Sequence, residues 1–292
     1  MQTKQQIRQL LSSEGISPRR RLGQHFLIDL NLMRLLINSA NISKDDIVLE
    51  VGCGTGSLTG GLAEKAGYCL AVEVDERIAG IAERELAEAE NVTVLNDDIL
   101  AGKNVINPVV TDAIVSARKR YSGKFLLVAN LPYNVASPVM LNLITGTMPA
   151  DAMYVTIQKE VAERMTAQPD SEHYGGISIF LAATGDVKTI RVLKPTVFWP
   201  QPKVDSAMIS FVRDKEKVGR IKSMELLKET VNLFMQHRRK KVTSCTKFAA
   251  GMLAGIDNWP ALFEKCNIDP NLRPDHLTVQ QFVDLANLCS EF

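Results

Sequence analysis

The stretch Ile47-Val48-Leu49-Glu50-Val51-Gly52-Cys53-Gly54-Thr55-Gly56 decides the fold of this chain. Its first five residues form a short, mostly apolar run, which is typical of a buried strand. The glycines at every second position after this run let the backbone turn tightly and come close to a ligand. A helix is expected directly afterwards, from about Leu58. Strand, glycine loop and helix together predict the first unit of an open α/β sheet.

Strand-like and helix-like segments alternate around this stretch. Apolar residues at helical spacing separate the strand-like runs through the first two thirds of the chain. Further strands are expected at residues 70–74, 92–95, 125–129 and 153–157, and a hairpin of residues 189–193 and 207–212 is expected to complete the sheet. This order predicts an α/β fold with a doubly wound, mostly parallel sheet.

The pattern changes after Asp214, where the chain becomes charged and then helical to its end. Ser223 is placed to cap a helix, and Thr278 with Gln281 has the spacing of a capping box. We therefore expect an α/β domain over residues 1–213 and a small all-helical domain over residues 214–292.

Composition limits the kind of protein that the chain can be. It has 292 residues, of which 46% are hydrophobic and 23% charged, so a packed core is expected. The five cysteines are odd in number and show no C-x-x-C spacing, which argues against a disulfide framework and a zinc site. No metal site is predicted. Without an apolar signal core at the N-terminus or a long apolar run, we expect a cytoplasmic protein that does not enter a membrane.

Two acids stand at the ends of successive strands and predict a nucleoside site. Glu73 ends the second strand, where a carboxylate can accept hydrogen bonds from both ribose hydroxyls. Asp98 follows the third, where it can accept from an adenine amino group, and Val74 or Ile99 can pack on the adenine ring. Dinucleotide enzymes use G-x-G-x-x-G, whereas Gly56 comes one residue early here. The pattern favours S-adenosylmethionine over a nicotinamide cofactor.

The tetrapeptide Asn130-Leu131-Pro132-Tyr133 follows the fourth strand, at the end where open α/β sheets bind ligands. The amide oxygen of Asn130 and the carbonyl of Leu131 can accept the two N–H bonds of an exocyclic amino group, and the Tyr133 ring can stack on the base. The plainer interpretation is a tight turn, because Asn and Pro are common in turns.

Motifs of a known family recur in order along most of the chain. They lie at residues 20–27, 50–56, 73, 98, 130–134, 158–161, 174–175 and 198–206. These motifs resemble those of the ribosomal RNA adenine N6,N6-dimethyltransferase family, whose bacterial members modify 16S rRNA of the small subunit. The sequence differs from the family pattern at Ala129, where glycine is common, and at Cys53, where proline is frequent.

The resemblance implies a Rossmann-like, class I S-adenosylmethionine-dependent methyltransferase. Its expected reaction is dimethylation at N6 of two adjacent adenosines near the 3′ end of small-subunit rRNA, with a role in subunit maturation. The predicted catalytic residues are Asn130, Leu131, Tyr133 and Phe198, of which Phe198 would form a second aromatic wall for the base. The predicted cofactor-binding residues are Gln24, His25, Leu27, Glu50, Gly52, Gly54, Glu73, Val74, Asp98, Ile99 and Asn130.

Two basic clusters predict contact with the phosphates of small-subunit rRNA or of a pre-30S particle. They are Arg19-Arg20-Arg21 and Arg238-Arg239-Lys240-Lys241, on a chain whose net charge is only +1. A local field matters more for phosphate binding than the net charge does. Either cluster taken singly is also compatible with a solvated helix face. We expect the protein to act as a monomer.

Three other functions remain as alternatives at this point. A 23S rRNA adenine N6-methyltransferase shares the tetrapeptide, but the loop at Phe198 and the long helical C-terminal domain favour the small-subunit enzyme. A non-catalytic ribosome-assembly factor on the same fold is disfavoured by the intact site residues. A dinucleotide oxidoreductase is disfavoured by the glycine spacing.

Overall fold

The computed structural model describes residues 1–19, 23–102 and 105–291. Its main sheet, within this described part, has seven strands in the order β4-β3-β2-β7-β8-β11-β9. The pairs from β4 to β8 are parallel, and β11 runs antiparallel to β8. The strands are β2 (Ile47–Val51), β3 (Tyr68–Glu73), β4 (Val92–Asn96), β7 (Phe125–Asn130), β8 (Ala152–Gln158), β9 (Gly185–Leu193) and β11 (Ser206–Arg213).

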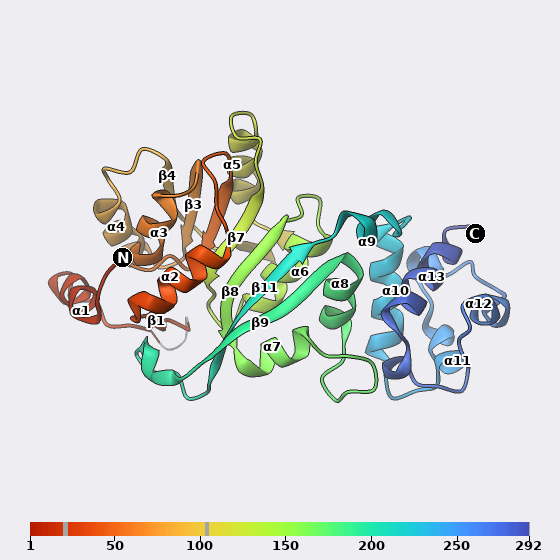
Figure 1. Cartoon of the computed structure of the whole chain (residues 1–292). Helices are drawn as coiled ribbons and strands as arrows, with labels where there is room; N and C mark the ends of the chain where they lie inside the picture. Colours follow the sequence, from red (N-terminus) through yellow and green to blue (C-terminus); the bar gives the residue numbers. More distant parts are fainter. Residues whose placement is uncertain (20–22, 103–104, 292) are drawn as a thin grey trace. The chain divides into compact units, whose positions relative to one another are not determined.

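Helices on both faces bury this sheet (Figure 1). All five residues of β2 are buried, as expected for a central strand of a doubly wound sheet. Val48 and Leu126 belong to a core cluster with residues of α2 and α3. The helices of the first part of the chain are α1 (Lys4–Ser13), α2 (Leu30–Ser39), α3 (Ser57–Ala63), α4 (Glu76–Glu85), α5 (Pro108–Arg118), α6 (Ala136–Thr145) and α7 (Lys159–Met165).

Two short ribbons lie outside the main sheet. β1 (Phe26–Leu27) pairs antiparallel with β10 (Phe198–Trp199), which follows the 3₁₀ helix η2 (Pro195–Val197). β5 (Leu100–Gly102) pairs with β6 (Val105–Ile106). The β1–β10 ribbon ties the N-terminal segment to the loop before β11, two segments far apart in the sequence.

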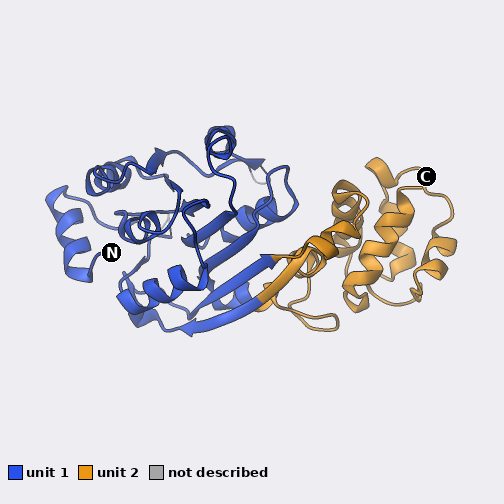
Figure 2. Ribbon diagram, turned by 45° about the horizontal axis from the view of Figure 1, so that its top comes forward, with its two compact units in different colours: residues 1–162, 188–212 blue, residues 163–187, 213–292 orange. Residues whose placement is uncertain are grey.

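The chain divides into two compact units, residues 1–162 with 188–212 and residues 163–187 with 213–292 (Figure 2). The second unit is helical, and the rings of Trp259, Phe263 and Phe282 pack around Phe234 in its core. Its elements are α8 (Gly176–Thr184), α9 (Lys215–Gly219), α10 (Met224–Gln236), α11 (Val242–Cys245), η3 (Thr246–Phe248), η4 (Gly251–Leu253), α12 (Trp259–Lys265), η5 (Pro274–His276) and α13 (Val279–Cys289).

The expected strands and the hairpin that completes the sheet are present, and the two expected helix caps form at Ser223 and Thr278. The sequence pattern did not indicate that residues 163–187 group with the C-terminal unit. Tyr174, which is 1% exposed, donates its hydroxyl to the Leu277 carbonyl at 3.0 Å, so this segment packs with the last helices of the chain. The functional division at residue 213 stays a prediction.

Across residues 1–19, 23–102 and 105–291, no helix combines the length and the apolar character needed to cross a bilayer.

Candidate active site

A cavity lies at the carboxyl ends of β2, β3 and β7, where the loops after these strands meet. Open α/β sheets bind their ligands at this edge. The space between these loops amounts to about 1020 Å³, a value that includes open solvent at the mouth. Every residue that the sequence predicted to bind the cofactor lines it: Gln24, His25, Leu27, Glu50, Gly52, Gly54, Glu73, Val74, Asp98, Ile99 and Asn130.

The glycine loop after β2 has a backbone that only glycine adopts without strain. The φ angle is +75° at Gly52 and +57° at Gly54, in the left-handed region. A Cβ on Gly52 would lie 2.7 Å from Cγ of Pro132, and a Cβ on Gly54 would lie 2.8 Å from Cε1 of Phe26. The glycines therefore allow this loop to pack directly against Pro132 of the tetrapeptide and Phe26 of the N-terminal segment.

Glu73 ends β3 with a carboxylate that is buried yet lines the cavity. Its oxygens accept the backbone N–H groups of Gly54 at 3.0 Å and Asp75 at 3.1 Å. Burial raises the pKa of Glu73, while these backbone hydrogen bonds act in the opposite direction. A carboxylate has about four acceptor positions, so it can still receive hydroxyl donors. This geometry is compatible with the predicted contact to two ribose hydroxyls.

Glu50 is a second buried acid on the cavity wall, and it is 3% exposed. The hydroxyl of Thr59 donates to its Oε2 at 2.7 Å. Burial raises the pKa of Glu50 to about 8, and the negative charge of nearby Glu73 acts in the same direction. Two buried carboxyl groups close together are stabilised in their ionised form by a positively charged neighbour. A sulfonium or an ammonium group is therefore a suitable ligand for this part of the cavity.

Asp98, Val74 and Ile99 border the cavity at the ends of β3 and β4. The Asp98 side chain accepts the backbone N–H of Leu100 at 2.9 Å, and its backbone carbonyl accepts from Asn107 Nδ2 at 2.9 Å. Val74 is 49% exposed although it is apolar, whereas Ile99 is buried. An acid beside two aliphatic side chains is suited to a flat, apolar ring that carries an amino group.

Gln24 presents a buried donor without a partner. Its Oε1 accepts the backbone N–H of Arg19 at 2.7 Å, but its Nε2 has no hydrogen-bond partner among the described residues. Buried donors in native proteins are nearly always satisfied, so this one is suited to a ligand oxygen such as a carboxylate. Arg19 forms an ion pair with Asp75 at 3.5 Å. Arg20 and Arg21, the rest of the predicted N-terminal cluster, lie outside the described residues.

Asn130 is the last residue of β7, and its amide is held at both ends. Its Nδ2 donates to the His25 carbonyl at 2.7 Å, and its Oδ1 accepts from the Thr156 hydroxyl. The backbone N–H of Leu131 donates to the Thr156 carbonyl at 3.1 Å. Within the described part of the chain, no group donates to the Leu131 carbonyl. Asn130 lines the cavity, whereas Leu131, which is 1% exposed, and Tyr133 are not among the residues that line it.

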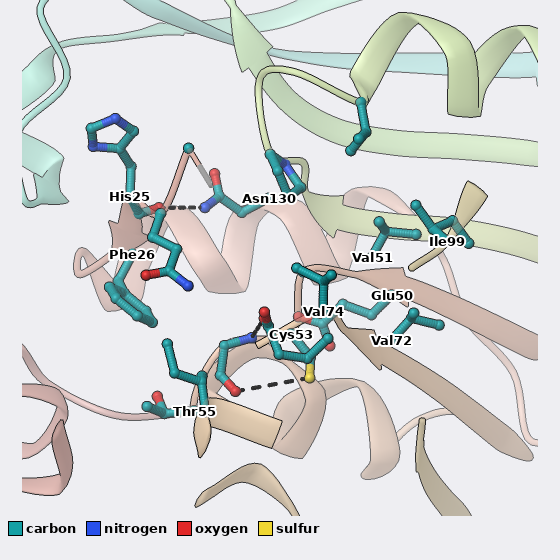
Figure 3. Close-up of a pocket in the computed structure, with 18 of the residues that line it drawn as sticks. His25, Phe26, Glu50, Val51, Cys53, Thr55, Val72, Val74, Ile99 and Asn130 are labelled. Atoms are coloured by element: carbon teal, nitrogen blue, oxygen red, sulfur yellow. Dashed lines mark hydrogen bonds between the residues drawn. The ribbon is translucent and has the colours of Figure 1, made fainter. Parts of the chain in front are cut away.

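Tyr133 is held by a hydrogen bond at its hydroxyl, and the His25 ring covers one face of its own ring. The hydroxyl shares a 2.7 Å hydrogen bond with Ser206 Oγ, and the ring stacks on His25 with centroids 5.5 Å apart. The Nδ1 of His25 lies 2.6 Å from the Pro200 carbonyl. Figure 3 shows the His25 ring pointing away from Glu50. The part of His25 in cofactor binding stays a prediction, and its ring is engaged here with Tyr133 and the Pro200 carbonyl.

The structure does not bring Phe198 to the cavity. In the β1–β10 ribbon Phe198 lies opposite Leu27, and Trp199 lies opposite Phe26. Because neighbouring residues of a strand face opposite sides, Phe198 turns inward with Leu27 and is 1% exposed in the core. Trp199 instead stacks on Phe26. A role for Phe198 as a second base wall would require this ring to leave the core, so the ring next to Tyr133 here is His25.

Other residues of the site were not singled out from the sequence. Thr156 comes from β8, and sheet pairing alone places it beside Asn130. Gln2 contacts the glycine loop, since its Oε1 accepts a hydrogen bond from the Thr55 hydroxyl at 2.6 Å. Ile7 of α1 also lines the cavity. Phe26 lines the cavity as well. Among these residues, Phe26 alone could have been found from the sequence, because it belongs to the motif at residues 20–27.

The fold and the cavity together define an S-adenosylmethionine-dependent methyltransferase. The two buried acids suit a cationic, ribose-bearing ligand, and Val74 with Ile99 suits its base. The Gln24 amide donor, which has no partner among residues 1–19, 23–102 and 105–291, suits its carboxylate. Comparison with known proteins narrows this class. The sequence model of the family described as ribosomal RNA adenine dimethylase matches residues 15–290. The chain therefore belongs to the ribosomal RNA adenine dimethylase family.

Curated relatives match along almost the whole chain. A protein of Latilactobacillus sakei named ribosomal RNA small subunit methyltransferase A is 33% identical over 297 residues, covering 98% of this chain and 95% of the relative. A protein of the same name from Pediococcus pentosaceus is 35% identical over 285 residues, covering 96% of this chain and 92% of the relative. The prediction of an S-adenosylmethionine-dependent rRNA adenine methyltransferase is thus confirmed.

Solved structures confirm the fold. A dimethyladenosine transferase from Plasmodium falciparum superposes with a TM-score of 0.72 at 20% identity, covering 91% of this chain and 98% of that one. The 23S rRNA methyltransferase ErmE superposes with a TM-score of 0.63, also at 20% identity, covering 91% of this chain and 99% of that one. The predicted α/β methyltransferase fold with C-terminal helices is therefore correct.

Proposed function

We propose that the protein transfers methyl groups from S-adenosylmethionine to N6 of two adjacent adenosines near the 3′ end of small-subunit rRNA, during subunit maturation in the cytoplasm. The names of the relatives from Latilactobacillus sakei and Pediococcus pentosaceus support the small subunit as the source of the substrate. The observation that carries the chemistry is the Asn130 amide at the cavity edge, fixed by Thr156 and by the His25 carbonyl.

The reaction needs help because the N6 lone pair of adenine is delocalised into the ring. In our proposal, Asn130 Oδ1 and the Leu131 carbonyl accept the two N–H bonds of the amino group. The nitrogen can then pyramidalise and direct its lone pair at the methyl group. Catalysis would come from positioning and from dipoles that are fixed before the reaction. Tyr133 would stack on the base once the His25 ring has moved aside, because that ring now covers one face of the tyrosine.

The cofactor would be held by residues of the cavity described above. Glu73 would accept from the ribose hydroxyls, Gln24 Nε2 would donate to the carboxylate, and Val74 with Ile99 would contact the adenine. S-adenosylmethionine supplies the electrophilic methyl group on a positively charged sulfur. The carboxyl of Glu50, which is 3% exposed, would counter that charge from the wall of the cavity.

The RNA would be held in part by the cluster Arg238-Arg239-Lys240-Lys241, all four of whose residues are exposed. We propose a monomer as the active form. In the N-terminal cluster, Arg19 is already engaged by Asp75, so this residue is a weaker candidate for phosphate contact.

The direct test is to incubate the protein with labelled S-adenosylmethionine and with purified undermethylated small subunits, and then to map the modified adenines. Label is expected on N6 of two adjacent adenosines near the 3′ end of the small-subunit rRNA. Large subunits and naked 23S rRNA serve as matched substrates. Label in 23S rRNA alone would favour the large-subunit alternative, and no label in any rRNA would favour a non-catalytic assembly factor.

A further inference from the structure

A pair of aromatic rings lies on the surface of the second unit, beside the basic cluster. Helix α10 ends at Gln236, and the chain then runs through His237 and the four cations to α11, a region shown in blue in Figure 1. Val242 and Cys245 are fully buried and anchor this connection. The chain then returns at Phe248, the last residue of η3.

The two rings are stacked, and one of them remains open to solvent. The centroids of His237 and Phe248 are 4.0 Å apart, and their planes differ by 22°. Phe248 is nevertheless 48% exposed. The ammonium group of Lys240 lies 5.6 Å from the centre of the Phe248 ring. A half-exposed aromatic ring that is backed by a second ring and approached by a cation is a preformed stacking surface.

The cations that neighbour these rings in the sequence are not used in ion pairs within the described part of the chain. Arg238, Arg239, Lys240, Lys241 and Lys247 are exposed, and within residues 1–19, 23–102 and 105–291 none lies within ion-pair distance of an acid. Three other lysines of the same unit are paired, with Asp186, Glu291 and Glu225. Lys241 donates to the amide oxygen of Asn271, which leaves its charge uncompensated. The positive field of this segment is therefore directed at solvent.

We propose that His237 and Phe248 form a stacking platform for an unpaired base of an RNA strand, whose phosphates contact the surrounding cations. This inference rests on the RNA substrate proposed above and adds a base contact to what was predicted as phosphate contact alone. Proteins that hold single strands combine cations along the backbone with aromatic rings under the bases. Lysine has a flexible four-carbon chain, so Lys240 can move from the ring to a phosphate as a base arrives.

The composition of the surface favours RNA over a protein partner. The cores of protein interfaces are depleted in charged residues. Here Lys240 approaches the exposed ring, and four more exposed cations lie within eleven residues of it in the sequence. Stacking is tolerant of base identity because every base has a flat face. The platform is therefore expected to hold a looped-out or single-stranded nucleotide without strong sequence preference.

The test compares two fluorescent RNA octamers that carry the same charge, one of adenosines and one in which every base is replaced by a tetrahydrofuran spacer. Binding to the full-length protein is measured by fluorescence anisotropy. Phe248→Ala should weaken binding of the adenosine octamer roughly 5- to 150-fold and leave binding of the spacer octamer unchanged. Contacts that bases make elsewhere on the protein do not affect this comparison, because the wild type and Phe248→Ala share them.

Further variants separate stacking from simple apolar contact. Phe248→Trp should restore the preference for the adenosine octamer, whereas Phe248→Leu should behave like Phe248→Ala. Val115→Ala, at an apolar residue with 49% exposure in α5, should leave both affinities unchanged. Arg239→Ala should weaken both octamers alike and reduce the salt slope of binding by roughly 0.7.

Three outcomes would overturn the platform: wild-type affinity of Phe248→Ala for the adenosine octamer, an equal loss on the spacer octamer, or full binding by Phe248→Leu. The second outcome would point to a phosphate-contacting or structural role, and the third to an apolar docking surface. Failure of the proposed methylation is read separately, from the mapping of labelled adenines. A protein that methylates no rRNA but shows the Phe248 dependence would retain the platform and lose the proposed function.

Discussion

The imidazole of His25 lies on the phenol ring of Tyr133, with centroids 5.5 Å apart and 30° between the planes. The Nδ1 of His25 also lies 2.6 Å from the Pro200 carbonyl, and its own carbonyl accepts from Asn130. One face of the tyrosine is thus covered by a ring of the same chain. An adenine that stacks on this face has to displace the histidine.

Replacement of His25 tests this relationship. Aromatic pairs contribute about 0.5–1.5 kcal/mol beyond the burial of their area, so His25→Ala should lower the KM for the rRNA substrate by roughly 2- to 12-fold if the base takes the same face. His25→Phe keeps a ring on Tyr133 and should keep a KM near that of the wild type. Steady-state methylation of small subunits measures both. A KM that rises in His25→Ala would mean that the histidine contacts the substrate instead of being displaced.

Thr156 is expected to act on catalysis through Asn130. Thr156→Val keeps the shape of the side chain but removes the hydroxyl that donates to Asn130 Oδ1. A typical hydrogen bond contributes about 0.5–1.5 kcal/mol, so kcat should fall roughly 2- to 12-fold while the Kd for S-adenosylmethionine stays unchanged by calorimetry. Asn130→Ala should abolish methylation while leaving cofactor binding nearly intact, because Asn130 is only one of eleven predicted cofactor contacts. Thr184→Val is the matched control, because its buried hydroxyl donates to the Phe180 carbonyl outside the cavity. Equal loss of kcat in the control would assign the effect to stability.

Gly52 joins cofactor binding to the tetrapeptide. Gly52→Ala would place a Cβ 2.7 Å from Cγ of Pro132, at a φ of +75° that alanine adopts only with strain. We expect weaker cofactor binding and a lower kcat together, because the loop and the tetrapeptide must both shift. Gly80→Ala, in helix α4, meets only the end of the Arg84 side chain at 3.9 Å and should have wild-type activity. Binding by calorimetry and initial rates measure the two effects, and a Gly52→Ala variant with normal values for both would contradict the proposed packing.

The sequence predicted those parts of the site that depend on short, local sequence patterns. The loop Gly52–Gly56 follows one strand, and Glu73 and Asp98 stand at the ends of two others. Because parallel strands end at one edge of the sheet, these residues can be expected to lie together without knowledge of long-range contacts. Thr156 carries no such signal, since it reaches Asn130 only through the pairing of β7 with β8. The inward turn of Phe198 depends on the register of β10 against β1, which a single sequence does not specify. The grouping of residues 163–187 with the C-terminal unit likewise depends on long-range packing.

Glu50 predicts a pH dependence of stability. Burial raises its pKa from an ordinary value of 4.5 to about 8, so the folded protein keeps a proton that the unfolded chain releases. Because the folded state binds more protons over this range, the contribution of Glu50 to stability falls as the pH rises from about 4.5 to about 8, and is constant above that. Burial also raises the pKa of Glu73, which leaves a smaller slope of the same sign in any Glu50 variant.

Glu50→Gln removes the titration and keeps an oxygen that can accept from Thr59. Melting temperatures of the ligand-free protein between pH 5 and pH 8 should fall by several degrees more in the wild type than in Glu50→Gln. Glu83→Gln, at an exposed glutamate of α4, should retain the wild-type slope. S-adenosylmethionine brings a positive charge to the cavity and should favour the ionised Glu50, so its binding should release protons near pH 7, measurable by calorimetry in buffers of different ionisation enthalpy. The same proton release in Glu50→Gln would show that another group is responsible.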